Sequence, residues 1–119
     1  MLENHLKLSR RGSEEDFLKS YREDSFIIMD GTVRRGLDGI RLCYRQLIRD
    51  LPNARFVYKS VIVEREVGFL KWSADSDTNT VSDGADSYVI RSGYIYAQTI
   101  HYTLAPKNKS ADVSKQKSG

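Results

Sequence analysis

The spacing of apolar residues changes near the middle of the chain, at Pro52. Before Pro52 the clearest apolar set recurs at three- and four-residue intervals, which is typical of a helix: Leu37, Ile40, Cys43, Tyr44, Leu47, Ile48 and Leu51. After Pro52, residues 54–63 and 67–74 form β-rich runs with a period of two around a hairpin tip. The pattern therefore predicts helices first and then a meander of long antiparallel strands, which is an α+β layout.

Three shorter elements are predicted before the long helix. A first helix that ends before Gly12 is indicated by Leu2, Leu6 and Leu8. Ser13, with Asp16 three positions later, has the spacing of a helix N-cap and predicts a second, brief helix. The apolar face of that helix consists of Phe17, Leu18 and Tyr21. A short strand follows over residues 26–29, and the turn pair Asp30-Gly31 ends it.

The last predicted hairpin has an unusual number of polar residues. Residues 84–104 read GADSYVIRSGYIYAQTIHYTL, with a turn at residues 91–93. Strand alternation places Asp86 and Tyr88 on one face of the first strand, and Gln98 and Tyr102 on one face of the second. Strands that only fill a core would carry aliphatic side chains at most of these positions. The polar groups therefore indicate a ligand site set in apolar walls.

Length and composition predict one globular domain. The chain has 119 residues, of which 39% are hydrophobic and 29% are charged, within the ordinary globular range. Much of the net charge of +3 comes from residues 107–119, where four lysines accompany one aspartate, so the charge does not favour a nucleic-acid partner. We expect a folded domain over residues 1–105 and a disordered, polar, basic tail over residues 106–119.

The sequence also argues against several other classes of protein. No segment has the apolar length of a membrane span, and the N-terminus lacks the apolar stretch of a signal peptide. The single cysteine, Cys43, lies in the apolar helical pattern, so a buried thiol and a cytoplasmic location are expected. Two histidines and one cysteine without ligand spacing predict no metal site. Neither a glycine-rich phosphate loop nor a GxSxG elbow is present, and no cofactor is expected.

Three segments together resemble the SnoaL-like branch of the nuclear-transport-factor-2-like superfamily. They are GLDGIRLCYRQLIRDLP, FLKWSAD and the hairpin of residues 84–104. That branch often has a glycine-led helix ending near Leu-Pro, a Trp-bearing strand, and a hairpin of the form D-x-F/Y-x-x-x-x-G-x-I. The resemblance covers roughly residues 1–105. It implies a strongly bent antiparallel sheet wrapped around N-terminal helices, which together form a cone-shaped α+β barrel with a pocket in its open mouth.

The resemblance also assigns the two faces of the last hairpin. By similarity to the ketosteroid isomerases of this superfamily, the pocket side carries Asp86, Tyr88, Ile90, Gln98, Ile100 and Tyr102. The convex side then carries Ala97, Thr99, His101 and Thr103, with Ile95 at its near end. We therefore expect a homodimer that forms through the convex face of the sheet.

Asp86 is the main candidate for chemistry. It matches the position where these isomerases keep a second, neutral acid that donates to a developing oxyanion. An apolar cavity disfavours an ionised carboxyl group, so Asp86 as a protonated donor is one interpretation. The other is a structural aspartate near the hairpin mouth, bonded to neighbouring amides or to Arg91. The sequence leaves both interpretations open.

Three further residues are candidate acids or bases. Asp30 follows the first strand, near the catalytic base of the isomerases, although a turn explains Asp30-Gly31 better. The isomerases' first-helix tyrosine matches about Asn4, with His5 beside it, so the standard triad is incomplete and His5 is the candidate acid–base histidine. His101 falls on the convex side and is interpreted as an interface residue.

Two functions remain. The first is a cofactor-independent isomerase, cyclase or dehydratase that moves a proton on a small apolar, cyclic or carbonyl-bearing molecule. The second is a non-catalytic ligand-binding or dimeric interaction module. Trp72, Tyr44 and Tyr58 are candidates to contact the ligand in either case, although a core role is preferred for Trp72. A complete acid–base pair in the pocket would favour the enzyme, and the sequence supplies half of one, Asp86.

Overall fold

Three helices and seven strands make up the part of the chain that the structure, a computed structural model, describes: residues 1–10 and 13–107. The helices are α1 (Leu2–Arg10), α2 (Glu14–Leu18) and α3 (Gly36–Asp50). The strands are β1 (Phe26–Met29), β2 (Thr32–Arg35), β3 (Arg55–Glu64), β4 (Val67–Asp75), β5 (Asn79–Arg91), β6 (Tyr94–His101) and β7 (Ala105–Pro106). Within the described residues, no helix is both long and apolar enough to cross a membrane.

All three helices lie where the apolar spacing predicts them. Ser13 caps α2, because its side-chain oxygen accepts a hydrogen bond from the backbone N–H of Asp16 at 3.3 Å. The turn after β1 is also confirmed, since Asp30 and Gly31 both have positive φ, 53° and 69°. That turn leads into β2, which pairs antiparallel with β1 and was not predicted. The local sequence therefore encodes a complete hairpin in front of α3.

The sheet is mixed, which corrects the expectation of a purely antiparallel one. Its strand order is β2-β1-β6-β5-β4-β3, and β7 pairs with β5 outside this path. All the strand pairs are antiparallel except β1 and β6, which run parallel with Phe26 opposite Ala97. β1 thus joins the sheet beside a strand that comes some 70 positions later in the chain. Apolar spacing cannot reveal such a distant partner.

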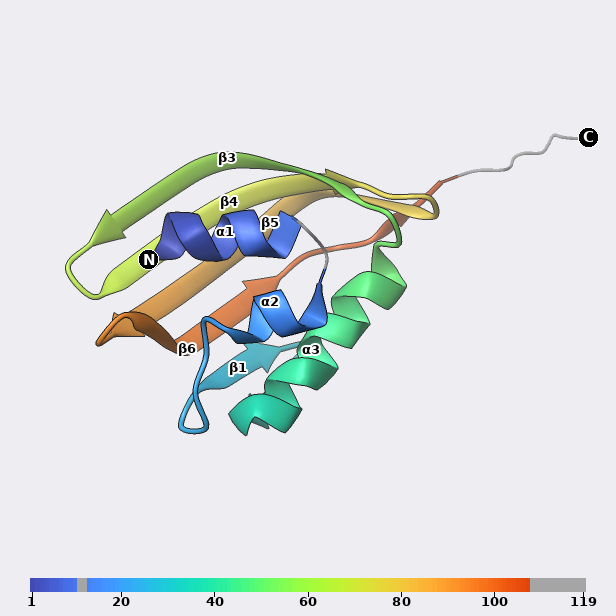
Figure 1. The fold of residues 1–119 in the computed structure, drawn as a ribbon. Coiled ribbons are helices and arrows are strands. Elements are labelled where there is room, and N and C mark those ends of the chain that lie inside the picture. Colours follow the sequence, from blue (N-terminus) through green and yellow to red (C-terminus); the bar gives the residue numbers. More distant parts are fainter. Residues whose placement is uncertain (11–12, 108–119) are drawn as a thin grey trace, which may run out of the picture.

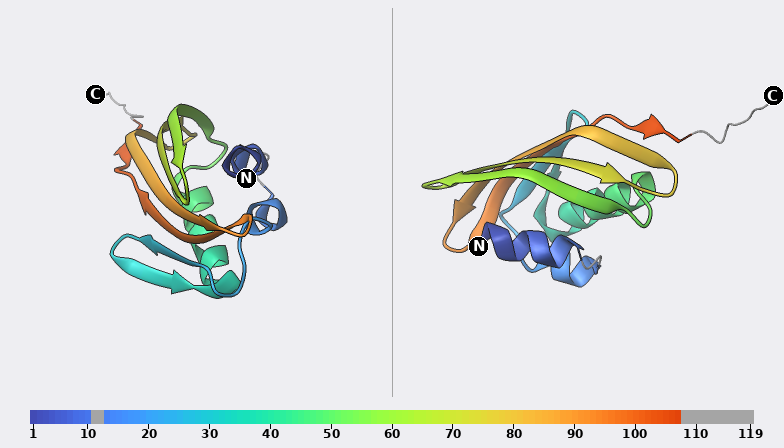
Figure 2. Two further views of the ribbon diagram at one scale, coloured as in Figure 1. Left: turned by 90° about the vertical axis from the view of Figure 1, so that its left-hand side faces the viewer. Right: turned by 90° about the horizontal axis from the view of Figure 1, so that it is seen from above.

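The sheet curves around the helices (Figure 1). The helices lie on its concave side, and the view from the end shows the strands bending past α3 toward α1 and α2 (Figure 2). The sheet remains open, with β2 and β3 as its two edges, so it does not close into the expected barrel. The α+β class and the strongly bent sheet are therefore confirmed. The concave face and the helices enclose the hydrophobic core.

The core corrects two residue assignments. Leu47, which the apolar stripe places in the core, is only half-buried, whereas Ile40 and Leu51 on the same side of the chain are buried almost completely. Ile95, expected on the convex face, is completely buried. A bulge between Val89 and Ile90 shifts the alternation of the hairpin next to it. The segment after α2 also packs there, since Ser25 Oγ donates to the Ile95 carbonyl at 2.6 Å.

The predicted end of the domain falls within a short strand. β7 crosses the expected boundary at residue 105 and pairs with Asn79 and Thr80 at the start of β5. Lys107 adds a salt bridge to Asp75, with Nζ and Oδ1 2.6 Å apart. The remainder of the predicted tail, residues 108–119, lies outside the described residues.

Candidate functional site

A cavity of about 70 Å³ lies between the helices and the concave face of the sheet. Its walls come from all three helices and from β3, β4, β5 and β6. They consist of His5, Leu6, Phe17, Tyr44, Leu47, Ile48, Phe56, Tyr58, Leu70, Trp72, Asp86, Tyr88, Gln98 and Ile100. The wall is mostly apolar and aromatic, with three strongly polar side chains. Binding sites for small molecules commonly have this composition.

Asp86 is at the centre of the polar part of the wall. It lies on β5 opposite Ile100 of β6, and its side chain is buried. Three side chains donate hydrogen bonds to its carboxylate: Trp72 Nε1 to Oδ1 at 2.9 Å, Gln98 Nε2 to Oδ2 at 3.0 Å and Tyr88 Oη to Oδ2 at 3.2 Å. Arg91 instead lies over the ring of Tyr96, at 4.1 Å from its centroid. Asp86 therefore does not form the bond to Arg91 that one interpretation of the sequence offered.

Burial controls the protonation of Asp86. Removal from water raises the pKa of its carboxyl group to about 6, and the hydrogen bonds from Trp72, Gln98 and Tyr88 oppose this rise only in part. None of the residues that line the cavity is a lysine or arginine that could compensate a negative charge. Asp86 is thus mostly ionised at pH 7, yet close enough to its pKa to exchange a proton readily.

His5 is part of the same polar network. Its Nδ1 lies 2.8 Å from Ser20 Oγ, and its Nε2 lies 3.4 Å from Tyr21 Oη. Tyr21 Oη in turn donates to Gln98 Oε1 at 2.5 Å, and Gln98 connects to Asp86. Burial lowers the pKa of His5 to about 4, so its imidazole is neutral at pH 7. The structure therefore brings the two candidates Asp86 and His5 into one hydrogen-bonded cluster.

Sequence reasoning missed two members of this cluster. Tyr21 was assigned only to the apolar face of α2, and Ser20 was not considered. Both are buried and follow directly after α2, where the chain turns toward β1. Tyr21 thus supplies a buried tyrosine hydroxyl group, which the isomerases carry on their first helix and which α1 lacks. The one available signal was a tyrosine, rather than an aliphatic residue, at the end of an apolar stripe.

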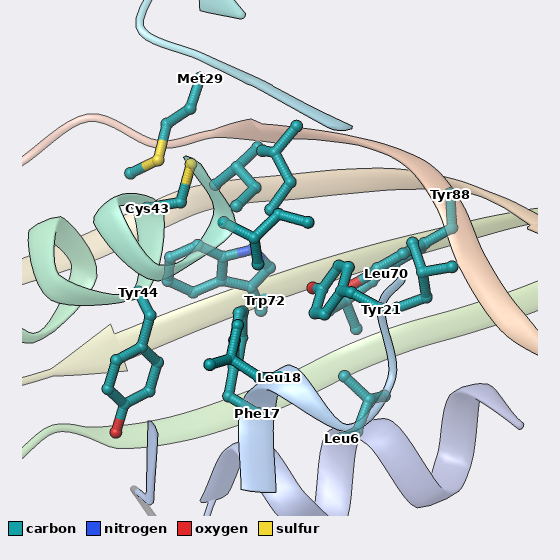
Figure 3. Packing of buried hydrophobic residues seen from close by; sticks show 14 of the residues in the cluster. Leu6, Phe17, Leu18, Tyr21, Met29, Cys43, Tyr44, Leu70, Trp72 and Tyr88 are labelled. Atoms are coloured by element: carbon teal, nitrogen blue, oxygen red, sulfur yellow. The ribbon is translucent and has the colours of Figure 1, made fainter. Parts of the chain in front are cut away.

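Aromatic side chains form much of the remaining wall. The Trp72 indole is buried among side chains from α2, α3 and the sheet (Figure 3). Tyr44 and Tyr58 also line the cavity. Tyr102 packs against Trp72 with 5.6 Å between ring centroids and donates to Asp50 Oδ2 at 2.8 Å, so it supports the wall from behind. Trp72 has a structural role as a core residue and a polar role as a donor to Asp86.

The other candidates lie outside the cavity wall. Asp30 is exposed at the β1–β2 turn, where its Oδ2 accepts from Gln46 Nε2 at 2.7 Å. Asn4 is exposed on α1. His101 is exposed, with Nε2 3.6 Å from Asp83 Oδ2. Among the described residues, no three histidine, cysteine, aspartate or glutamate side chains gather as metal ligands would.

Comparisons with known proteins identify the fold. The sequence matches no family model and no curated protein. An NTF2-like protein of unknown function from Burkholderia xenovorans superposes with a TM-score of 0.73 at 14% identity, over 92% of this chain and 84% of that chain. A similar protein from Cytophaga hutchinsonii gives a TM-score of 0.66 at 14% identity, over 86% and 85%. A protein from Jannaschia sp. CCS1 that is assigned to the SnoaL-like polyketide cyclases gives 0.68 at 12% identity, over 85% and 83%.

Each of these superpositions covers more than four fifths of both chains. The chain therefore has the nuclear-transport-factor-2-like fold, as the sequence resemblance implied. Identities this low carry the likeness of fold and nothing about activity. Function has to be argued from the cavity itself.

Proposed function

We propose that the protein binds a compact apolar molecule in this cavity and moves a proton on it, with Asp86 as the base and without a cofactor. The observation that carries the proposal is the position of Asp86: a carboxylate on the wall of an apolar cavity, with a pKa raised by burial to about 6. A general base works best when its pKa lies near the operating pH.

The proposed step is a proton shuttle. Ionised Asp86 takes a proton from an acidic C–H group of the ligand, adjacent to a carbonyl, and then returns it to a different atom. A carboxylate has about four acceptor positions, and three hydrogen bonds from the protein reach Asp86. One position therefore remains for the ligand. The small cavity favours a ligand the size of a single ring, or a larger one that displaces side chains of the wall.

Hydrogen–deuterium exchange of small cyclic ketones tests this proposal. We expect the protein to accelerate exchange of the protons next to the carbonyl of cyclopentanone in D₂O, measured by NMR. The rate should rise with pH and level off above about 6, because the base acts in its ionised form. Asp86→Asn should lower the accelerated rate by about 10²- to 10⁴-fold. Asp83→Asn, which changes an exposed carboxylate on the same strand, is the matched control.

The alternative is a non-catalytic binding module with the same cavity. Three side chains of the protein already donate hydrogen bonds to Asp86. A carboxylate with a purely structural role would have the same set of partners, which favours this alternative. In that case cyclopentanone would shift the NMR signals of residues around the cavity without faster exchange. Equal exchange rates in the wild type and Asp86→Asn would reject the enzyme and leave this alternative.

We also propose a homodimer through the convex face of the sheet. Several large apolar side chains are exposed there and elsewhere on the sheet, among them Ile28 (40% exposed), Phe69 (40%) and Val67 (56%). Ile28 and Val67 border a shallow depression that Ala97 and Thr99 of β6 also line. Exposed apolar side chains on one face of a sheet are typical of an interface, and a two-fold axis would bring equivalent residues together.

Thr99→Glu is expected to shift the protein from dimer to monomer in light scattering. Thr99 is exposed in the single chain, so the substitution should leave the fold of the monomer intact. In a dimer the new charge would be buried without compensation. His101→Ala should have a smaller effect, and Ser82→Glu, at an exposed position of β5, should have none. A dimer that tolerates Thr99→Glu, or a wild-type monomer, would refute this interface.

A further inference from the structure

A chain of four hydrogen bonds joins Ser20 to Asp86 through the buried core. It runs from Ser20 Oγ to His5, then to Tyr21 Oη, then to the Gln98 amide and finally to Asp86 Oδ2. All five side chains are buried, with at most 7% of their surface exposed. Their donor and acceptor atoms therefore depend on partners within the protein, because little of their surface is accessible to water.

The direction of every link follows from the end at Asp86. An ionised carboxylate only accepts, so Gln98 points its NH₂ group to Asp86 and its carbonyl oxygen to Tyr21. Tyr21 donates its single hydroxyl hydrogen to the side-chain carbonyl oxygen of Gln98. Its hydroxyl oxygen can therefore only accept a hydrogen bond from His5. His5 then carries its hydrogen on Nε2, and its bare Nδ1 accepts from Ser20 Oγ. All four bonds thus point toward the carboxylate.

We propose that His5, Tyr21 and Gln98 are positioning residues for Asp86, joined so that the charge of Asp86 sets the tautomer of His5. The chain keeps a hydrogen-bond donor on Oδ2, which stabilises the ionised carboxylate in its apolar surroundings. His5, Tyr21 and Gln98 thereby hold the base ready. This inference rests on the proposed function, since it explains how that base is kept ionised.

Protonation of Asp86 reverses the chain. Trp72 only donates and keeps Oδ1 as an acceptor, whereas Gln98 and Tyr88 both donate to Oδ2 in the ionised state. A hydrogen that settles on Oδ2 requires an acceptor there, and the Gln98 amide supplies one by turning over, with its oxygen toward Asp86 and its NH₂ group toward Tyr21. Tyr21 then donates to His5 Nε2, and His5 carries its hydrogen on Nδ1 and donates to Ser20. Asp86 gains one proton in total, while His5 stays neutral and exchanges its hydrogen from one nitrogen to the other. The two states have the same number of bonds between these five side chains.

Four tyrosines and the cysteine near the chain have raised pKa values and stay neutral while this happens. Burial raises the pKa values of Tyr21, Tyr88, Tyr44 and Tyr102, with Tyr21 and Tyr88 raised well above 10. Burial also raises the pKa of the Cys43 thiol to about 11. Tyr58 is the remaining tyrosine on the cavity wall, and the carboxylate of Asp50 lies behind Tyr102. Asp86 and His5 are therefore the groups of the cavity wall that are expected to change near pH 4 to 6.

The tautomer of His5 can be read by NMR without any ligand. Long-range ¹H–¹⁵N spectra distinguish the protonated ring nitrogen from the bare one, and His101→Gln removes the signals of the other histidine. At pH 7.5 we expect the hydrogen of His5 on Nε2. In Asp86→Asn, whose amide group mimics the protonated acid, we expect it on Nδ1. Lowering the pH of the wild type through about 6 should give the same change without any substitution at Asp86.

Tyr21→Phe tests whether the signal passes through the chain. It removes the hydroxyl group and keeps the ring, so Asp86→Asn should no longer move the hydrogen of His5 in this background. Tyr102→Phe is the matched control, because it removes a hydroxyl bonded to Asp50, outside the chain. In that background the change should persist.

Two results would overturn the inference: a His5 hydrogen on Nδ1 in the wild type at pH 7.5, or a tautomer that ignores both Asp86→Asn and acid titration. Neither depends on turnover. A normal tautomer change with no ketone exchange would reject the proposed enzyme and preserve the coupling. Ketone exchange that depends on Asp86, combined with a His5 tautomer that does not change, would support the proposed enzyme and reject the coupling.

Discussion

Gly84→Ala is expected to destabilise the protein by about 3 kcal/mol or more, the upper end of the usual cost of overpacking. Gly84 on β5 pairs directly with Trp72 on β4, and the indole of Trp72 lies over the glycine. A Cβ atom at position 84 would lie 2.8 Å from Trp72 Cε3 and closer still to Cδ2 and Cε2. The indole has little room to move, because it is buried and its Nε1 is bonded to Asp86.

Urea unfolding followed by tryptophan fluorescence measures this effect, since Trp72 is the single tryptophan. Repeating the substitution in a Trp72→Leu background, followed by circular dichroism, isolates the cause. There the cost of Gly84→Ala should shrink, because the ring that meets the new methyl group is gone. A near-neutral Gly84→Ala in the wild-type background would show that the indole does not lie against β5 in solution.

Ile40→Ala is expected to lower the free energy of unfolding by about 2–5 kcal/mol, as for other large-to-small changes in a core. Ile40 is completely buried on the face of α3 that packs against the sheet. Leu47→Ala, two turns later in the same helix, should cost clearly less. Its side chain is half-buried, so the substitution removes less buried surface and leaves a smaller cavity.

The two substitutions form a matched pair in one helix. Chemical denaturation at the same pH gives the change in the free energy of unfolding for each. Equal costs would mean that α3 is rotated relative to the described structure, with Leu47 deeper and Ile40 shallower. A larger cost at Leu47 than at Ile40 would contradict the packing of the whole helix.

The helices and hairpins could be predicted because their signals are local. Apolar spacing located α3, Ser13 located the start of α2, and Asp30-Gly31 located the first turn. Pairing between distant strands has no local signal, so the parallel contact of β1 with β6 was missed. β2 was missed for a related reason: its residues, TVRR, are mostly exposed and show no apolar alternation.

The same limit applies to the site. Strand parity correctly placed Asp86 and Gln98 on the buried side of the hairpin, because alternation is a property of the strand itself. It failed at Ile95, since a bulge breaks the alternation there. Tyr88 shares the strand and face of Asp86, as alternation predicts, but the bonds from Trp72 and Gln98 cross from β4 and β6 and depend on a strand register that the sequence does not show. Tyr21 reaches the cluster from outside the sheet, and only the packing of the segment after α2 places it there.

The parallel contact between β1 and β6 has a consequence for the order in which the chain can fold. All three described helices belong to the first half of the sequence, whereas the long strands that make up most of the sheet, β3 to β6, begin at residue 55. As a nascent chain leaves the ribosome, the N-terminal half therefore has the short β1–β2 hairpin against α3 and none of the long strands that complete the core. β1 cannot take its place until β6 has emerged, so the closing event joins segments far apart in the chain. Such non-local closure is slow compared with the formation of a helix. The interval in between leaves apolar surface in water, which is the period when a chaperone is most useful to a growing chain.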